Sequence, residues 1–139
     1  MDIINKTIEI STKGETDIVD ITGEVQKLFD QAALNKGLCT VFVPGATGGV
    51  STIEFEPGVV RDIKDALEKV APREAFYSHN TKWGDGNGVA HVRAALMKPS
   101  LSIPFSGGAL SLGTWQQIVF MDFDTRPRQR SIVVQFIGV

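Results

Sequence analysis

Residues 22–43 read TGEVQKLFDQAALNKGLCTVFV. The apolar residues of this stretch change from helical spacing to a short β-prone run. Thr22 suits the N-cap of a helix, and Gly37 suits the position just past a helix end. Residues 38–43 then form a compact β-prone run, which is typical of a central strand. The apolar positions of the expected helix recur at helical spacing and share one face: Val25, Leu28, Phe29, Ala32 and Ala33.

Strands outnumber helices in the rest of the chain and gather towards its two ends, which favours an α+β fold over alternating βαβ units. A second helix starts at Pro57 and stops before Pro72, and a short helix over 87–97 has Asn87 as its cap. Turns at 106–108 and 125–130 each join a pair of antiparallel strands. The expected strands are 7–11, 16–21, 38–43, 51–55, 101–104, 109–112, 118–123 and 131–137.

Length and composition restrict the class of protein. The 139 residues are expected to form one domain, 1–139. The composition, with 42% hydrophobic and 22% charged residues, excludes a disordered chain. A net charge of -2 gives no electrostatic basis for binding nucleic acid or anionic membranes. The single cysteine excludes a disulfide framework, and no apolar run approaches the roughly 20 residues that span a bilayer. We therefore expect one cytoplasmic domain without nucleic-acid or membrane partners.

Both histidines fall in one polar, glycine-rich segment, in the pattern His79-x5-Asp85-x5-His91. Two imidazoles and a carboxylate commonly form the first shell of a divalent metal ion such as zinc, manganese or magnesium. The same three residues could instead transfer protons, with Asp85 orienting one imidazole. Since the spacing matches no established short motif, a third interpretation is a simple turn with surface or capping histidines.

Several residues near this segment could bind a substrate. Arg93 follows His91 by two residues and is expected at the same pocket mouth, and Trp83 could stack on a planar ring or simply cover the core. Glu54 and Glu56 are either paired carboxylates or a solvated strand face. Cys39 lies within an apolar strand and is expected to be an inert core thiol.

Two further segments could bind anions. The small residues 45–49 could do so through backbone N–H groups, although a plain tight connection explains them as well. Arg126, Arg128 and Arg130 could hold phosphate or pyrophosphate as guanidinium forks, or be solvated charges of a turn.

Taken together, these segments resemble the YjbQ family, described as secondary thiamine-phosphate synthases. The most specific likeness combines the Asn-Gly-x-x-His element at Asn87–His91 with the run Gly113-Thr114-Trp115-Gln116. Other matching segments are His79-Asn80, 85–94, 100–105, 110–118, 126–128, 133–138, 41–54 and Glu56-Pro57 followed by Asp62. The likeness spans nearly the whole chain and is closest to an archaeal-type branch.

The resemblance implies a compact YjbQ-like α+β domain with an extensive antiparallel or mixed sheet, two main helices and assembly as a homotrimer. It also implies a pocket in which His79, Asp85 and His91 act as catalytic residues and hold a divalent metal ion. A small phosphorylated substrate would contact Arg93, Asn87, Trp83, Thr47, Glu54 and Arg128. One departure is Gly45, which stands where many bacterial relatives have histidine.

The reaction implied by the resemblance couples hydroxymethylpyrimidine pyrophosphate to thiazole phosphate and releases pyrophosphate. Two alternatives remain open at this point. The chain could be a metal-assisted phosphate-ester hydrolase, or a trimeric metal- or ligand-binding protein without catalytic activity.

Overall fold

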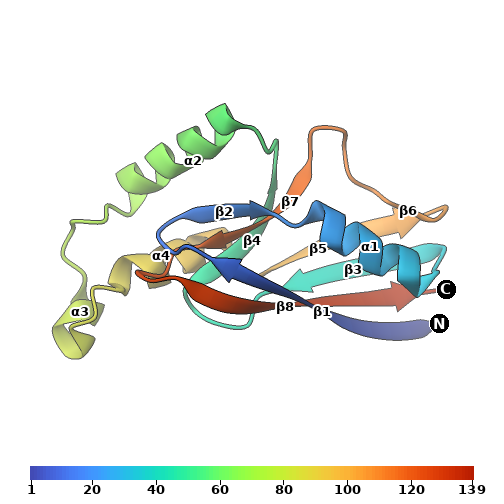
Figure 1. Cartoon of the computed structure of the whole chain (residues 1–139), viewed down its shortest axis with the longest axis horizontal. Coiled ribbons are helices and arrows are strands. Elements are labelled where there is room, and N and C mark those ends of the chain that lie inside the picture. The colour runs from blue at the N-terminus through green and yellow to red at the C-terminus, as the bar shows by residue number, and fades with distance from the viewer.

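The computed structural model describes all residues, 1–139, as two antiparallel sheets and four helices (Figure 1). The larger sheet has the strand order β1-β8-β3-β5-β6, and the smaller sheet has the order β2-β7-β4. In chain order the elements are β1 (Asp2–Thr12), β2 (Asp17–Asp20), α1 (Thr22–Ala32), β3 (Lys36–Phe42), β4 (Gly48–Ile53), α2 (Pro57–Val70), α3 (Ser78–Trp83), α4 (Gly88–Met97), β5 (Ser100–Ser106), β6 (Ala109–Leu110), β7 (Gln117–Asp122) and β8 (Arg128–Gly138).

Strand β7 lies at the centre of the smaller sheet and is covered on both faces, which explains why its residues 118–121 are all apolar. Ile118 and Phe120 face the main core, between the smaller sheet, the larger sheet and α1. Val119 and Met121 face a second core, which they share with residues of α2 and α4 such as Leu67. The smaller sheet is therefore the middle layer of the molecule.

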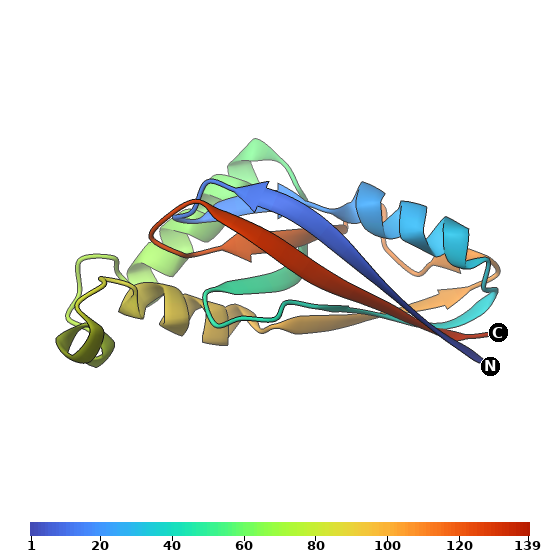
Figure 2. The ribbon, with the colours of Figure 1, turned by 60° about the horizontal axis from the view of Figure 1, so that its bottom comes forward.

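Helix α1 covers the larger sheet near the chain termini, while α2, α3 and α4 lie towards the other end (Figures 1 and 2). Its apolar face carries Phe29, whose ring centroid lies 4.9 Å from that of Phe105 and 5.8 Å from that of Phe136. The predicted central strand is confirmed, because β3 pairs with both β8 and β5. The helix and strand of residues 22–43 thus supply part of the main core.

The ends of α1 differ from the prediction. Thr22 is the first helical residue rather than the cap, since its hydroxyl donates to Asp20 and accepts from the backbone N–H of Ile118. The helix ends at Ala32, and Ala33 takes the left-handed conformation with φ 54°. Gly37 lies in β3, where any Cβ would overlap the carbonyl oxygen of Ile137. This glycine therefore permits close approach of β3 and β8 rather than ending a helix.

The predicted turn between the last two strands is wrong. Strands β7 and β8 belong to different sheets, and residues 123–127 cross from one sheet to the other. The error arose because local turn signals do not reveal which strands become neighbours. The chain also has helix α3, which the sequence did not predict, beside the expected α1, α2 and α4. None of the helices is long and apolar enough to cross a membrane.

We expect Phe136→Ala to lower the free energy of unfolding by about 3–5 kcal/mol, because it opens a cavity among the aromatic rings of the main core. The matched control is Phe76→Ala, since Phe76 is 80% exposed. It should change stability by less than about 0.5 kcal/mol. Urea denaturation followed by circular dichroism measures both, and equal effects would contradict the assigned core.

Candidate functional site

The structure brings His79 and His91 together, although they are separated by the α3–α4 turn. Their ring centroids lie 4.5 Å apart, with 46° between the ring planes. The side-chain oxygen of Asn80 accepts a hydrogen bond of 2.9 Å from the backbone N–H of Gly88, which ties α3 to the start of α4. A Cβ at Gly88 would lie 2.6 Å from the Cβ of Tyr77, so the close approach of the two helices requires glycine there.

Each imidazole is held through its Nδ1 atom. The Nδ1 of His91 lies 3.0 Å from the carbonyl oxygen of Ala46. The Nδ1 of His79 lies 3.4 Å from the side-chain oxygen of Asn80 and 3.5 Å from a carboxylate oxygen of Asp85. Because all three oxygens can only accept, these contacts favour a proton on Nδ1 in each ring. In the neutral state the lone pair of each ring is then on Nε2, so both rings can accept a proton or bind a metal ion at that atom.

Asp85 acts on the outer side of His79, at Nδ1, and not beside the Nε2 atom. No group of three or more His, Cys, Asp and Glu side chains in the chain is arranged to hold a metal ion. The three residues therefore do not form one coordination sphere within a single chain. The arrangement instead matches the carboxylate–imidazole pair that fixes a ring's tautomer and direction.

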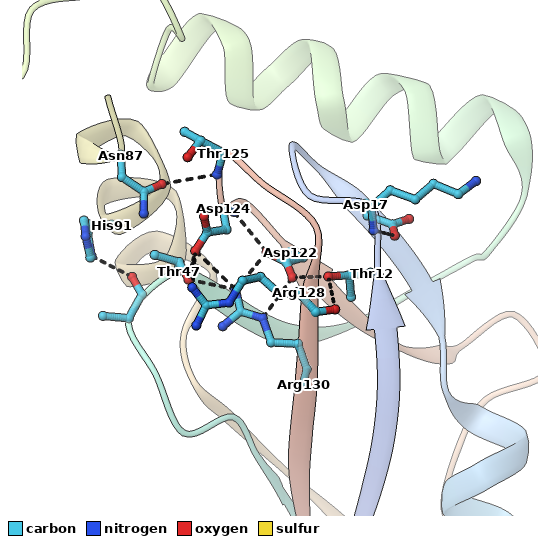
Figure 3. Close-up of polar contacts among 12 residues, drawn as sticks. Thr12, Asp17, Thr47, Asn87, His91, Asp122, Asp124, Thr125, Arg128 and Arg130 are labelled. Carbon is cyan, nitrogen blue, oxygen red and sulfur yellow. Dashed lines mark hydrogen bonds and ion pairs between the residues drawn. The ribbon is translucent and has the colours of Figure 1, made fainter. Parts of the chain in front are cut away.

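A buried cluster of charged and hydroxyl side chains lies behind the loop that holds His91 (Figure 3). Arg130 of β8 makes a two-bond contact with Asp122 of β7, with distances of 2.9 and 2.8 Å. Arg130 also donates to the hydroxyl of Thr47 at 2.7 Å, and that hydroxyl donates to Asp124 at 3.1 Å. Thr47 follows Ala46 directly, so the cluster fixes the carbonyl that binds His91.

The cluster also sets the charge states of its members. Burial raises the pKa of Asp122, but hydrogen bonds from Arg130, Thr12 and the Asp124 N–H outweigh it, and the pKa falls below its usual value. The hydrogen bond to Asp122 in turn raises the pKa of Arg130. Both groups are therefore ionised at neutral pH, as an ion pair that is largely excluded from water.

Arg128 is half-buried at the start of β8 and lies 3.2 Å from a carboxylate oxygen of Asp124. Thr47, by contrast, is only 7% exposed, and its hydroxyl is used by Arg130 and Asp124. Of these two candidate substrate contacts, Arg128 is the one with an accessible polar group. Thr47 holds the loop.

Arg93 lies away from the two histidines. Two residues along a helix correspond to about 200°, so Arg93 and His91 face nearly opposite sides of α4. The Arg93 guanidinium is buried and donates to the carbonyl oxygen of Ala71, the Thr16 hydroxyl and a Glu68 carboxylate oxygen. Arg93 thus ties α4 to the end of α2 and to the β1–β2 turn, and the expectation of a shared pocket mouth is not met.

Three other candidates occupy different places. Trp83 is 64% exposed next to His79, with ring centroids 6.5 Å apart. Asn87 lies at the start of α4, where its side-chain oxygen accepts from the backbone N–H of Thr125 at 3.3 Å. Glu54 is exposed beyond the end of β4. Since a strand rises about 3.3 Å per residue, the length of β4 separates Glu54 from Thr47, and the two side chains do not meet at one site.

His91 lines a cavity of about 250 Å³ with Gly45, Ala46, Gly48, Ala94, Ala95 and Pro99. Gly45 has φ 128° and opens directly onto this cavity. The sequence left residues 45–49 open between an anion-binding loop and a plain connection. Of these residues, Gly45, Ala46 and Gly48 line the cavity beside His91, while Thr47 is buried against Arg130 and Asp124.

The buried acids Asp122 and Asp124 and the hydroxyl of Thr12 were not predicted as members of the site. A signal was present in the sequence: residues 119–124 read VFMDFD, and carboxylates within an apolar run require buried partners. Arg128 and Arg130 have the same two-residue spacing as the acids, and β8 places them where they can pair with the acids. Cys39, predicted as a core thiol, is fully buried, and burial raises its pKa to about 12.

The fold and the site define a class of α+β protein with two antiparallel sheets. Its candidate site is a pair of imidazoles on α3 and α4, next to the glycine-rich loop 45–49. Residues 6–139 match the family model described as UPF0047 protein YjbQ-like, and the chain belongs to this family. A UPF0047 protein of Mycobacterium bovis is 40% identical over 120 residues, which cover 86% of this chain and 91% of the relative. One from Methanothermobacter thermautotrophicus is 32% identical and covers 99% and 94% of the two chains.

Solved structures agree in fold. A YjbQ-like protein of unknown function from Sulfolobus solfataricus superposes with a TM-score of 0.94 at 28% identity, over 99% of each chain. An uncharacterised family member from Clostridium acetobutylicum gives 0.82 at 38% identity, over 94% of this chain and 99% of that one. The resemblance to YjbQ proteins and the expected α+β fold are thereby confirmed, with four helices in place of two main ones.

We expect Thr47→Val to change the tautomer of His91, because the buried cluster then loses its hold on the Ala46 carbonyl. The measurement is the ring ¹⁵N spectrum at a pH where imidazoles are neutral, and the two histidines make it simple to assign. The Nδ1–H form should dominate in the wild type and give way to a mixture in the variant.

Thr47→Ser keeps the hydroxyl and should keep the wild-type spectrum. Thr12→Val is the matched control, because Thr12 binds the same cluster through Asp122 but lies away from the loop. It should lower stability without altering His91. A His91 spectrum that responds equally to Thr12→Val and Thr47→Val would contradict a local effect.

Proposed function

We propose that the chain is an enzyme for a small phosphorylated substrate, and that it couples hydroxymethylpyrimidine pyrophosphate to thiazole phosphate. The observation that carries this proposal is the His79–His91 pair, with each ring held at Nδ1 and each Nε2 left for a reactant. The choice of reaction rests on the resemblance of the sequence to the YjbQ family described as secondary thiamine-phosphate synthases, and residues 6–139 match the model of the YjbQ-like family.

In this reaction the thiazole ring nitrogen attacks the methylene carbon of the pyrimidine. The new C–N bond forms as the C–O bond to pyrophosphate breaks, and the electron pair leaves with the pyrophosphate oxygen. The protein must hold the two substrates in line and stabilise the leaving group. In their protonated forms, His79 and His91 can each donate an Nε2–H hydrogen bond to a phosphate oxygen.

Two further side chains suit these substrates. Arg128 is held by Asp124 but remains half-exposed, so its guanidinium can also pair with a phosphate oxygen. The Trp83 indole is exposed beside His79 and offers a face on which the pyrimidine can stack. Within the proposal, Asn87 positions the start of α4, and Arg93 fixes α4 through its hydrogen bonds to the end of α2 and to Thr16.

The proposal includes a divalent metal ion that has two protein ligands instead of three. The Nε2 atoms of His79 and His91 would be its two protein ligands, and the other positions would fall to water or substrate oxygens. Asp85 would act as the outer partner of His79 rather than as a ligand. When bound, the ion would neutralise charge on pyrophosphate.

The contact between Asp85 and His79 also favours a second candidate, a phosphate-ester hydrolase. With its proton at Nδ1 next to Asp85, His79 presents the lone pair of Nε2, which can take a proton from an attacking water. The nucleophile is the thiazole nitrogen in the synthase reaction and water in the hydrolase reaction. An assay with the two thiamine-phosphate precursors and with simple phosphate esters therefore distinguishes the candidates.

We expect purified wild-type protein to form thiamine phosphate, and His91→Ala to lose about 100-fold in turnover, because removing one donor that stabilises developing charge typically costs about 10²–10³. Product is measured by chromatography, with added zinc, magnesium or manganese and with a chelator. The control variant is Val70→Ala, an exposed residue at the end of α2 that has no role in the proposed site, and it should keep its activity.

Faster hydrolysis of simple phosphate esters than formation of thiamine phosphate would replace the first candidate by the hydrolase. Turnover of neither substrate set by folded protein would favour a binding protein without catalytic activity. Unchanged turnover by His91→Ala would refute the site.

We further propose that the chain works as a homotrimer whose neighbours complete the site. The helices that carry His79 and His91 also carry exposed apolar side chains: Trp83 on α3, and Val92 and Leu96 on α4. Exposed apolar side chains of this size are typical of a surface that another protein covers. Light scattering should give three times the 15.1 kDa chain mass, and Leu96→Glu should shift it towards the monomer. A monomeric wild type that retains full activity would contradict this proposal.

A further inference from the structure

The cavity beside His91 has hydrogen-bond donors without partners in the chain. Gly45 and Ala46 line it, and no hydrogen bond within the chain engages their backbone N–H groups. The Ala46 carbonyl is turned to His91, at 3.0 Å from its Nδ1. The loop is thus held to His91 through the carbonyl oxygen of Ala46, while the N–H groups of Gly45 and Ala46 are left to bind a ligand.

A buried guanidinium lies next to Gly45, although Arg130 is not among the residues that line the cavity. Arg130 is only 6% exposed, and its hydrogen bonds to Asp122 and Thr47 all come from Nε and one terminal nitrogen, Nη2. The other terminal nitrogen, Nη1, has no partner within the chain. A Cβ placed on Gly45 would have this Nη1 as its nearest neighbour, at 3.6 Å, so the atom lies just behind the glycine that opens onto the cavity.

We propose that the cavity lined by Gly45, Ala46 and His91 binds a phosphate or pyrophosphate group, with Arg130 Nη1 and the loop N–H groups as donors. The inference rests on the proposed function, whose substrates carry these groups, and it assigns the group to a specific cavity. It also adds Arg130 to Arg128 as an arginine of the site, whereas Arg93 is turned to the other side of α4.

The chemistry of the donors selects an oxyanion. Guanidinium and backbone N–H groups donate only, so the ligand must present several acceptor oxygens. The carboxylates of Asp122 and Asp124 repel an anion little, since they already accept bonds from Arg130, Arg128 and Thr47. The absence of a Cβ at Gly45 allows the ligand to approach the backbone and Nη1 together.

Binding of inorganic pyrophosphate and of phosphate by calorimetry tests the proposal without any turnover. Ala95 is an exposed residue of α4 that lines the same cavity. Ala95→Glu places a negative charge at the cavity mouth and should weaken pyrophosphate binding about fivefold or more, with a smaller effect at high salt. Ala95→Gln is the neutral control of nearly the same size, so the difference in pyrophosphate binding between the two variants reports the charge and not the added bulk.

Ala109→Glu makes the same change in net charge on β6, at the opposite end of the molecule from α4 (Figures 1 and 2). It should bind pyrophosphate like the wild type. Equal weakening by Ala109→Glu and Ala95→Glu would reduce the effect to overall charge and overturn the assignment, as would equal binding by Ala95→Glu and Ala95→Gln. Arg130→Lys, checked for folding by circular dichroism, should also weaken binding, because it removes Nη1.

The outcomes separate this inference from the proposed function. Pyrophosphate binding that Ala95→Glu weakens, without formation of thiamine phosphate, would keep the anion site and reject the reaction. Thiamine phosphate formation whose KM for the pyrophosphate substrate is unchanged in Ala95→Glu would keep the reaction and reject the anion site. Failure of wild-type protein to bind pyrophosphate or phosphate at millimolar concentration would reject the anion site outright.

Discussion

A two-bond ion pair between Asp122 and Arg130 joins the two sheets of this protein, since Asp122 belongs to β7 and Arg130 to β8. Thr12 of β1 donates to the same carboxylate, so three strands meet at one buried group. Burying an ion pair brings little net stability, but removing one partner typically costs about 3–5 kcal/mol because the other charge is left unpaired. What the pair specifies is the relative position of the sheets, and therefore of the loop and helix that carry the candidate site.

Local periodicity was enough to predict most elements of the fold. The apolar face of α1 and the β-prone run of β3 were both evident within residues 22–43, because each depends on side chains close in sequence. The assignment of strands to sheets was not evident. Strands β7 and β8 look like a hairpin locally, yet they part into different sheets because the apolar residues of β7 serve two cores. That constraint arises only when α2 and α4 are present to cover the outer face.

The candidate site was predictable in part for the same reason. His79 and His91 were grouped because one short segment contains both, and the α3–α4 turn brings their rings to 4.5 Å. Arg93 was grouped with them by sequence distance, although the helical period turns it to the other side of α4. For Arg130 the sequence leaves open a phosphate-binding guanidinium or a solvated turn charge, because nothing local shows that Asp122 and Asp124 meet it in the interior. Long-range pairing decides which arginine reaches the site.

The burial of Arg130 bears on how the site would work. A surface lysine or arginine must give up side-chain freedom when it binds an anion, whereas Arg130 is already fixed by Asp122 and Thr47 before any ligand arrives. Its charge is balanced by the acids, so the cavity does not attract anions strongly from a distance, and discrimination depends on the shape of the donors near Gly45. The same Thr47 hydroxyl links Arg130 to the loop that fixes His91. Anion binding and the orientation of the imidazole would therefore respond together to any change in the buried cluster.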